Sequence, residues 1–302
     1  MNENWITIAP VGYGTKNITK INFQFDNNFI LGPMPEWFIN DKWKTNLNAN
    51  EKDRLKRSQI GFQIKYKASS LGDPDPSFKG EEKRSLQDKA EELVGFALLS
   101  IWITKPSLLC CRLYTHWEHT NGTWIWREIN RNRGFLIHPK DVKQNITEED
   151  LVKAKNLYSG IIKCPRKNNL WTAIRTVFCA LSSYPWSTQY LLFWIAIEAL
   201  FGDSSEITYR ISQRLALFME NDKQIAYELF KKIKNSYTHR SSIAHGSSVP
   251  GKTREERERI GFDLQEILCK SLIMILEDQE KIRIFSSKDR KEFLDKLCFG
   301  IN

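Results

Sequence analysis

The sequence predicts an α+β fold, with a mixed or β-rich N-terminal domain over residues 1–145 followed by an all-α helical bundle over residues 146–302. Short segments of the first half alternate apolar and polar residues with period two, which is typical of strands. From Thr147 onward the apolar residues recur at the spacing of amphipathic helices. A chain of 302 residues is long enough for two domains, and its 41% hydrophobic residues are ample for a packed core.

The N-terminal half opens with three predicted strands, in the sequences WITIAPV, KINFQFD and NNFILGP. Apolar residues such as Phe23 and Phe25 stand at alternate positions there. The stretch from about 40 to 67 is polar and charged, and we assign no element to it. Residues 69–80 hold the Gly, Pro, Asp and Ser of a loop, whereas residues 81–103 have the apolar spacing of a helix.

The stretch RLYTHWEHTNGTWIWREI predicts a hairpin. The Asn-Gly pair at 121–122 is favoured in type I′ turns, because both residues tolerate positive φ. Folding the chain about this pair places His119 opposite Trp124 and Trp117 opposite Trp126. The predicted hairpin therefore carries an aromatic face.

The C-terminal half predicts a series of helices, two of which begin with recognisable caps. Thr147 with Asp150, and Thr253 with Glu256, have the spacing of N-terminal capping pairs. Pro165, Pro185, Gly202 and Gly246 stand where helices are expected to stop. The expected helices are residues 147–164, 168–183, 187–202, 205–220, 222–246, 253–280 and 288–299.

The net charge of +9 favours an anionic partner, although the charge is spread evenly along the chain. Residues 1–145 hold 21 Lys and Arg against 16 Asp and Glu, and residues 146–302 hold 24 against 20. Six cysteines form no CxxC pair, so we expect buried free thiols and neither a bound metal nor a cofactor. The longest apolar run, YLLFWIAIEALF, is too short to span a bilayer, and we expect a soluble, cytoplasmic protein with no membrane partner.

The stretch KKIKNSYTHRSSIAHG holds the residue types that metal-independent RNA cleavage needs. In that reaction the 2′-hydroxyl attacks its own phosphate, which requires proton transfer and a cation for the phosphorane. Histidine suits the proton transfer, and arginine can engage two phosphate oxygens. Arg240 and His245 are the candidates, with the basic run Lys231, Lys232 and Lys234 on the same helix as an RNA-binding patch.

An Arg and a following His with four to six residues between them also occur elsewhere, at Arg112/His119, Arg131/His138 and Arg133/His138. Those pairs fall in a predicted strand or around a loop, and only Arg240/His245 lies at the end of a long amphipathic helix. Five helical residues turn a side chain by about 140°. Either the helix loosens at 241–244, or a second copy of the chain completes the site.

Each residue of this motif also has a structural interpretation. Arg240 and His245 can be a salt-bridging arginine and a helix-capping histidine, and the lysines can be a solvated face. Glu198, inside WIAIEALF, needs a partner, which Arg210 or Arg214 on the next helix could supply.

Outside this helix, the HWEH stretch invites a metal hypothesis. His116 and His119 would point to opposite faces of a strand, however, so we expect no metal there.

Three stretches of the C-terminal half resemble HEPN domains, and specifically the Apea-like branch of that superfamily. LLFWIAIEALFG resembles the apolar helix with an internal Glu, here Glu198, and ITYRISQRLALFME resembles the helix that follows. IKNSYTHRSSIAHG resembles the signature Tyr-x-x-Arg-Ser-x-x-x-His-Gly, and the resemblance covers residues 165–300. By position it implies Arg240 and His245 as the catalytic pair, with Ser241, Tyr237, His239 and Glu198 in support.

The resemblance implies a dimeric helical bundle and, in many members, an endoribonuclease of defence or toxin–antitoxin systems. We therefore expect RNA as partner, with tRNA as one candidate, a homodimer, and a phage-derived or cognate protein as trigger. Two alternatives stay open. The chain could be a non-catalytic dimerisation module whose N-terminal half binds a partner, or a nucleotide-binding module in which Arg240 holds a phosphate.

Overall fold

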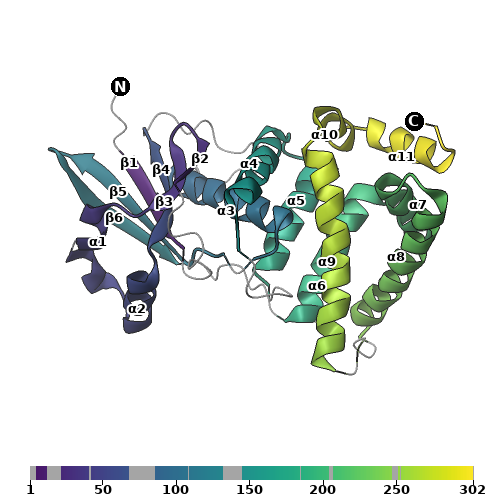
Figure 1. Ribbon diagram of the computed structural model, residues 1–302, viewed down its shortest axis with the longest axis horizontal. Helices are drawn as coiled ribbons and strands as arrows, with labels where there is room; N and C mark the ends of the chain where they lie inside the picture. The colour runs from purple at the N-terminus through teal and green to yellow at the C-terminus, as the bar shows by residue number, and fades with distance from the viewer. Residues whose placement is uncertain are drawn as a thin grey trace, which may run out of the picture. The chain divides into compact units, whose positions relative to one another are not determined.

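The computed structural model confirms the α+β prediction, with a six-stranded antiparallel sheet in the N-terminal region and a helical C-terminal half (Figure 1). The chain divides into two compact units, residues 1–158 and 159–302. The division falls inside helix α4, Glu148–Lys163, which follows the boundary expected near 145. The structure describes residues 5–11, 22–40, 42–67, 86–107, 109–131, 145–183, 185–203, 207–246, 251 and 253–301.

The sheet has the strand order β2-β3-β4-β1-β5-β6. Its strands are β1 (Trp5–Pro10), β2 (Phe23–Asp26), β3 (Phe29–Pro33), β4 (Ile60–Tyr66), β5 (Leu113–Thr120) and β6 (Thr123–Arg131). Strand β4 lies in the polar stretch of residues 40–67, where the sequence predicted no element. It pairs with β3 and with β1, and six of its seven residues are buried, so it is a central strand rather than part of a polar connection.

The hairpin of β5 and β6 has the register that the sequence predicts. Trp117 pairs with Trp126 and His119 with Trp124, about a turn in which Asn121 has φ 52° and Gly122 has φ 81°. These positive angles are those that the Asn-Gly pair accommodates.

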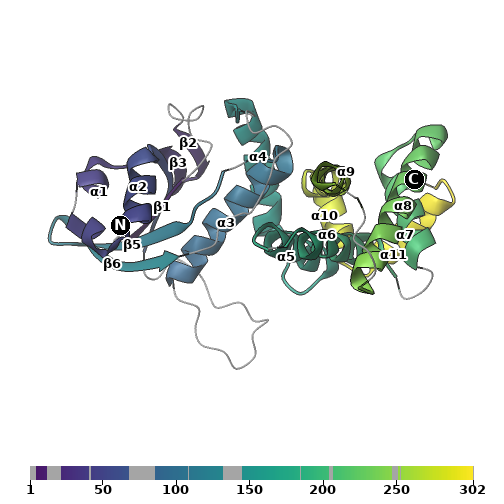
Figure 2. The same cartoon turned by 90° about the horizontal axis from the view of Figure 1, so that it is seen from below.

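The aromatic face of this hairpin belongs to a hydrophobic core on one side of the sheet. Helix α1 (Glu36–Asn40), the 3₁₀ helix η2 (Lys42–Asn46) and helix α2 (Ala49–Arg57) supply residues to that core (Figure 2). The Trp117 ring is fully buried and meets Trp37 and Trp43 edge-on, at centroid distances of 5.0 and 5.8 Å. Large rings that interlock in this way stabilise the unit through burial of apolar area.

A chain of polar contacts links the sheet to helix α3 (Leu86–Thr104). The buried His116 ring contacts Thr7 Oγ1 through Nδ1 at 2.9 Å and Glu91 Oε1 through Nε2 at 2.9 Å. Asn130 donates to the same carboxylate oxygen at 2.8 Å, and Tyr66 contacts Thr7. Burial raises the pKa of Tyr66 to about 12. The partners satisfy the polar groups of His116 that its burial removes from water.

The helical unit starts within α4 and continues through seven further helices (Figure 1). Both predicted caps are confirmed, because Thr147 with Asp150, and Thr253 with Glu256, exchange backbone and side-chain hydrogen bonds. The seven helices that follow α4 are α5 (Asn169–Leu181), α6 (Trp186–Phe201), α7 (Ile207–Met219), α8 (Lys223–Ala244), α9 (Arg254–Leu276), α10 (Gln279–Phe285) and α11 (Asp289–Cys298).

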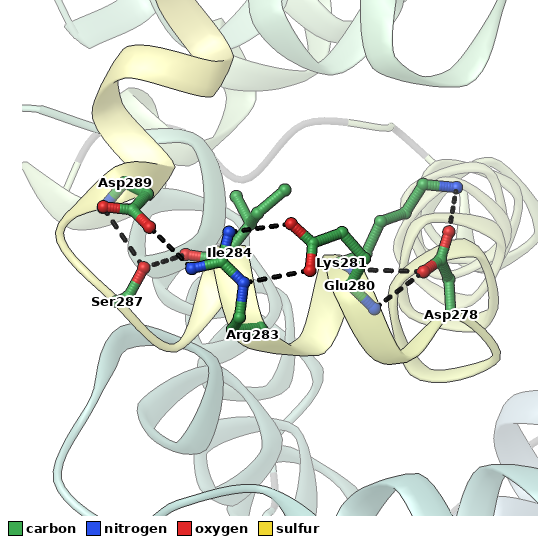
Figure 3. Close-up of polar contacts among 7 residues, drawn as sticks. All are labelled: Asp278, Glu280, Lys281, Arg283, Ile284, Ser287 and Asp289. Atoms are coloured by element: carbon green, nitrogen blue, oxygen red, sulfur yellow. Dashed lines mark hydrogen bonds and ion pairs between the residues drawn. The ribbon is translucent and has the colours of Figure 1, made fainter.

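The helix expected over 253–280 is interrupted at Asp278, which caps a new helix, α10. Its carboxylate accepts hydrogen bonds from the backbone N–H groups of Glu280 and Lys281 at 2.9 and 3.2 Å (Figure 3). Arg283 then bridges Glu280 and Asp289 across the surface. A capping aspartate stabilises a helix start, so it explains why α9 does not run on through this position.

Two arginines hold the C-terminal end of α6. The buried Arg214 donates to the carbonyl of Phe201 at 3.2 Å and contacts Asp295 Oδ1 at 2.5 Å. Arg290 Nη1 donates to the carbonyls of Leu200 and Gly202 at 2.7 and 3.1 Å. Cations at the last carbonyls of a helix satisfy acceptors that have no partner within the helix. Burial lowers the pKa of Arg290, and the Arg214 charge lowers it further.

Replacement of Gly160 by alanine is expected to destabilise the helical unit, although alanine favours helices by about 1 kcal/mol over glycine. A Cβ at Gly160 would lie 2.5 Å from the Leu276 carbonyl oxygen and 3.3 Å from Ile282 Cδ1. Backbone cannot rotate away as a side chain can, so we expect a net loss of about 1–2 kcal/mol. Thermal unfolding measures it, with Asn156→Ala on the exposed side of α4 as control. A Gly160→Ala protein as stable as the parent would contradict the close approach of α4 and α9.

Candidate functional site

The candidate motif lies at the C-terminal end of α8. Asp222 caps the start of this helix, and residues 241–244 remain helical. Gly246 has φ 69°, a conformation that glycine adopts readily, and it ends the helix just after His245. The loosening considered at 241–244 is therefore absent. The turn of about 140° between the two side chains remains.

Arg240 faces α6 and forms an ion pair with Glu198. Its Nε lies 3.0 Å from Glu198 Oε1, although this pair lacks hydrogen-bond geometry, and Nη2 donates to Oε2 at 3.3 Å. Both side chains are about three-quarters buried. The expected partner of Glu198 was Arg210 or Arg214, and that expectation is wrong for Arg214, which contacts Asp295 instead. A cation from α8, Arg240, thus pairs with Glu198.

Aromatic side chains from α6 and α8 support this pair. The Tyr237 ring lies 5.5 Å from Arg240 Cζ and meets the Trp194 ring edge-on at 5.1 Å. One turn earlier, the Tyr190 hydroxyl contacts Ser236 Oγ at 2.6 Å and donates to its carbonyl at 3.0 Å. Arg240 is therefore held by a carboxylate and an aromatic ring, which limits the rotamers open to it.

His245, in contrast to the largely buried Arg240, has an exposed side chain. It occupies the C-cap position of α8, its backbone N–H donates to the carbonyl of Ser241 at 3.1 Å, and its side chain is exposed. Ser241 is half-buried. Across the parts of the chain that the structure describes, no polar contact joins Arg240 to His245. One copy of the chain therefore does not bring the predicted pair together.

The remaining predicted residues separate onto different faces of α8. Lys231 Nζ lies 4.8 Å from the Tyr227 ring, and Lys234 Nζ lies 5.9 Å from the Phe230 ring. Lys232 instead lines a groove between α8 and α9, and so does His239. Burial lowers the pKa of His239, which keeps the imidazole neutral near pH 7.

Two sets of residues near these faces were not predicted from the sequence. Tyr209 and Tyr227 are more than half exposed, and with Phe230 they form an aromatic surface on α7 and α8. Arg259 and Asp263 of α9 line the groove with His239. Their four-residue spacing places them on one helix face, but only the packing of α9 against α8 shows that this face meets His239.

The structure offers no metal site within its described residues, since no group of three His, Cys, Asp or Glu side chains gathers there. In the HWEH stretch, His116 is buried and bonded to Thr7 and Glu91, whereas His119 is exposed and packs on Trp124. The two histidines point to opposite faces, as expected for a strand. Among the competing Arg/His pairs, Arg133 and His138 lie outside the described residues.

Comparisons of this chain with protein-family models, with curated proteins and with solved structures found no match. The helices that the structure describes include none long and apolar enough to cross a membrane. The HEPN-like signature thus remains an interpretation of the three sequence stretches, beside the geometry of α6 and α8.

Proposed function

We propose that this chain is a metal-independent endoribonuclease of the HEPN type, acting in antiphage defence or as a toxin. It cuts single-stranded or looped RNA, with tRNA as one candidate, in a site that two copies of the chain complete. The observation that carries the proposal is the end of α8, where an anchored arginine is followed by an exposed histidine. This pairing supplies a fixed cation and an accessible proton carrier.

The ion pair with Glu198 suits Arg240 to hold a phosphate. Glu198 engages Nε and Nη2, and among the described residues Nη1 has no polar partner. Guanidinium N–H groups that point out of such an anchor can bind a phosphate oxygen without losing the anchoring carboxylate. Arg240 would stabilise the phosphorane in this way, and Glu198 would act as its positioning residue.

His245 can carry the proton, because its exposed imidazole can reach a bound RNA strand. In the proposed step His245 takes the proton of the 2′-hydroxyl, and the 2′-oxygen forms a bond to phosphorus. The bond from phosphorus to the 5′-oxygen breaks, that oxygen takes a proton from solvent, and His245 then releases its own proton to solvent. The products are a 2′,3′-cyclic phosphate and a 5′-hydroxyl end.

A second copy is needed because Arg240 and His245 face different sides of α8. A two-fold dimer that joins the C-terminal ends of both α8 helices places the arginine of one copy near the histidine of the other. The aromatic surface with Lys231 and Lys234 can then extend the site. Exposed rings stack on bases and lysines attract the backbone, a combination that binds single strands without sequence preference.

Expression of the intact chain in a bacterial host is expected to inhibit growth and to produce RNA fragments that end in 2′,3′-cyclic phosphates. Sequencing of the RNA ends identifies the cleavage sites, and the purified protein should cut the same RNA in excess EDTA. Arg240→Ala should abolish both effects. The control is Arg254→Ala, which removes an exposed arginine that pairs with Glu258 on the same helix, α9.

Unchanged RNA ends on expression of the intact chain, together with no cleavage by the purified protein, would refute nuclease action. The alternative is a non-catalytic HEPN-like module that dimerises and binds RNA or a nucleotide. One observation favours it: Arg240 is engaged by Glu198 and does not contact His245. Under that alternative, the intact chain would bind RNA or a nucleotide, and neither the parent nor the Arg240→Ala protein would produce new RNA ends.

A further inference from the structure

Strand β6 forms one edge of the sheet in the N-terminal unit (Figure 1). Its nine residues, Thr123–Arg131, pair with β5 on one side, and among the described residues no hydrogen bond reaches its backbone from the other side. A strand that is paired on one side only presents a row of N–H and C=O groups that can bind another strand. Strand β6 is therefore an open edge.

The opposite edge of the same sheet is protected. Strand β2 has four residues, its register with β3 shifts between Gln24 and Asp26, and Lys155 of α4 donates to the Gln24 carbonyl at 2.9 Å. A short strand, an irregular register and a lysine over the edge are devices that stop a sheet from growing. Strand β6 is longer, and no side chain covers its free backbone in the part of the chain that the structure describes.

The side chains of β6 alternate between the two faces of the sheet, with one change of phase at Arg127. The register with β5 shifts there, because Trp126 pairs with Trp117 and the next paired residue is Glu128, opposite His116. An extra residue of this kind moves the side chains after it to the opposite faces. The face toward α1 and α2 holds Trp124, Trp126, Ile129 and Arg131, and the face toward α3 holds Ile125, Arg127, Glu128 and Asn130.

This change of phase restricts how the β6 strands of two copies can pair about a two-fold axis. Residues directly opposite each other in an antiparallel pair point to the same face. An axis between Arg127 and Glu128 satisfies this condition over residues 124–131. An axis through either of these residues, or between Trp126 and Arg127, places side chains from opposite faces across from each other. Axes nearer the ends of the strand pair fewer residues.

The pairing over residues 124–131 also brings complementary side chains together. Arg127 of each copy lies opposite Glu128 of the other. Glu128 is exposed and forms no ion pair within the described ranges, and Arg127 is 44% exposed although it contacts Glu118. Trp126 lies opposite Ile129, so the apolar face of one core continues into the next. Opposite charges and apolar pairs across two strands both stabilise a sheet.

We propose that β6 is a self-association surface, at which two copies pair their β6 strands antiparallel about an axis between Arg127 and Glu128. The pairing joins the sheets of two N-terminal units and covers Ile125, which is 38% exposed. A strand of another protein could bond to the same backbone, but β6 complements itself on both faces, which favours a second copy. The surface contains neither Arg240 nor His245, so it is separate from the α8 ends and independent of the proposed RNA cleavage.

Charge reversal tests this pairing in the intact chain. Arg127→Glu places two acidic residues across from each other and Glu128→Arg places two basic residues there, so each should weaken self-association about tenfold in sedimentation velocity. The double variant Arg127→Glu/Glu128→Arg exchanges the charges and should associate as the parent does. A mixture of the two single variants should also associate, because each then faces charges opposite to its own.

Arg57→Glu is the matched control, since it reverses an exposed arginine of α2 outside β6 and should associate as the parent does. Hydrogen exchange of the β6 amides should slow as the concentration of the parent rises, and the single variants should lose this protection. None of these substitutions alters α8, so any association through the α8 ends is common to all the chains. Thermal unfolding of each variant establishes that it is folded.

The proposal fails on any of three results. A parent that stays monomeric, with β6 amides that exchange rapidly at every concentration, would leave the edge to an extended segment of another protein. Association that neither single reversal weakens would place the contact elsewhere, as at the α8 ends. Loss of association in both single variants, with no recovery in the double variant or the mixture, would show that Arg127 and Glu128 do not face each other.

Discussion

Replacement of His245 by alanine is expected to abolish RNA cleavage and growth inhibition while leaving the stability of the fold unchanged. The side chain is exposed at the end of α8 and has no packing role there, so its loss removes only chemistry. Positioned proton transfer contributes about 10²–10⁴-fold to a rate, and we expect a loss of that size. RNA cleavage is measured beside thermal unfolding, with His119→Ala, another exposed histidine, as control.

Mixing two inactive proteins tests the two-copy site directly. If each site joins Arg240 of one copy to His245 of the other, a mixed dimer of Arg240→Ala and His245→Ala has one intact site. Random exchange of subunits would then restore about a quarter of the parent activity. No recovery after exchange, with both variants shown to form dimers with each other, would place both residues in a site within one copy. Cleavage by His245→Ala alone at the parent rate would show that His245 takes no part in the mechanism.

Replacement of Arg214 by alanine is expected to lower the stability of the helical unit more than the other arginine-to-alanine replacements do. The side chain is 2% exposed and joins the Phe201 carbonyl to Asp295. Truncation leaves a cavity, a carbonyl without its donor and a carboxylate without its cation. Loss of one partner of a buried pair costs about 3–5 kcal/mol, and the half-exposed Asp295 can regain water, so we expect about 3 kcal/mol.

Thermal unfolding measures this effect, and Arg283→Ala is the matched control. Arg283 also contacts two carboxylates, at 2.7 and 2.8 Å, but its side chain is 58% exposed (Figure 3). Water replaces such surface partners, so the melting temperature of Arg283→Ala should hardly change. Equal decreases in the melting temperatures of Arg214→Ala and Arg283→Ala would show that burial does not make the Arg214 contacts more stabilising.

Local patterns in the sequence predicted the elements well where one residue type dictates one conformation. The Asn-Gly pair set the hairpin register, and the Thr253 cap set the start of α9. Strand β4 was missed because it follows a polar, helical stretch, although Ile60, Phe62 and Ile64 show the period-two alternation of a strand. The interruption at Asp278 was missed because the apolar spacing continues past it into α10.

The candidate site was predictable as a set of residues but not as an arrangement. Helix geometry alone indicated that Arg240 and His245 diverge, and α8 stays helical between them. The partner of Glu198 was not predictable, because Arg240 lies 42 positions away and only tertiary packing brings α8 against α6. For the same reason, the sequence did not reveal that His239, rather than His245, shares a groove with Arg259.

The C-terminal end of α6, which Arg214 and Arg290 hold, depends on residues that are synthesised late. Phe201 lies three residues after Glu198, and its carbonyl and those beside it depend on Arg290 and on the Arg214–Asp295 pair. Arg290 and Asp295 belong to α11, so they leave the ribosome some 50 residues later than Arg240 does. Until then the last turn of α6, which follows Glu198, lacks these partners. The arrangement of Glu198 and Arg240 is therefore complete only after α11 has been translated.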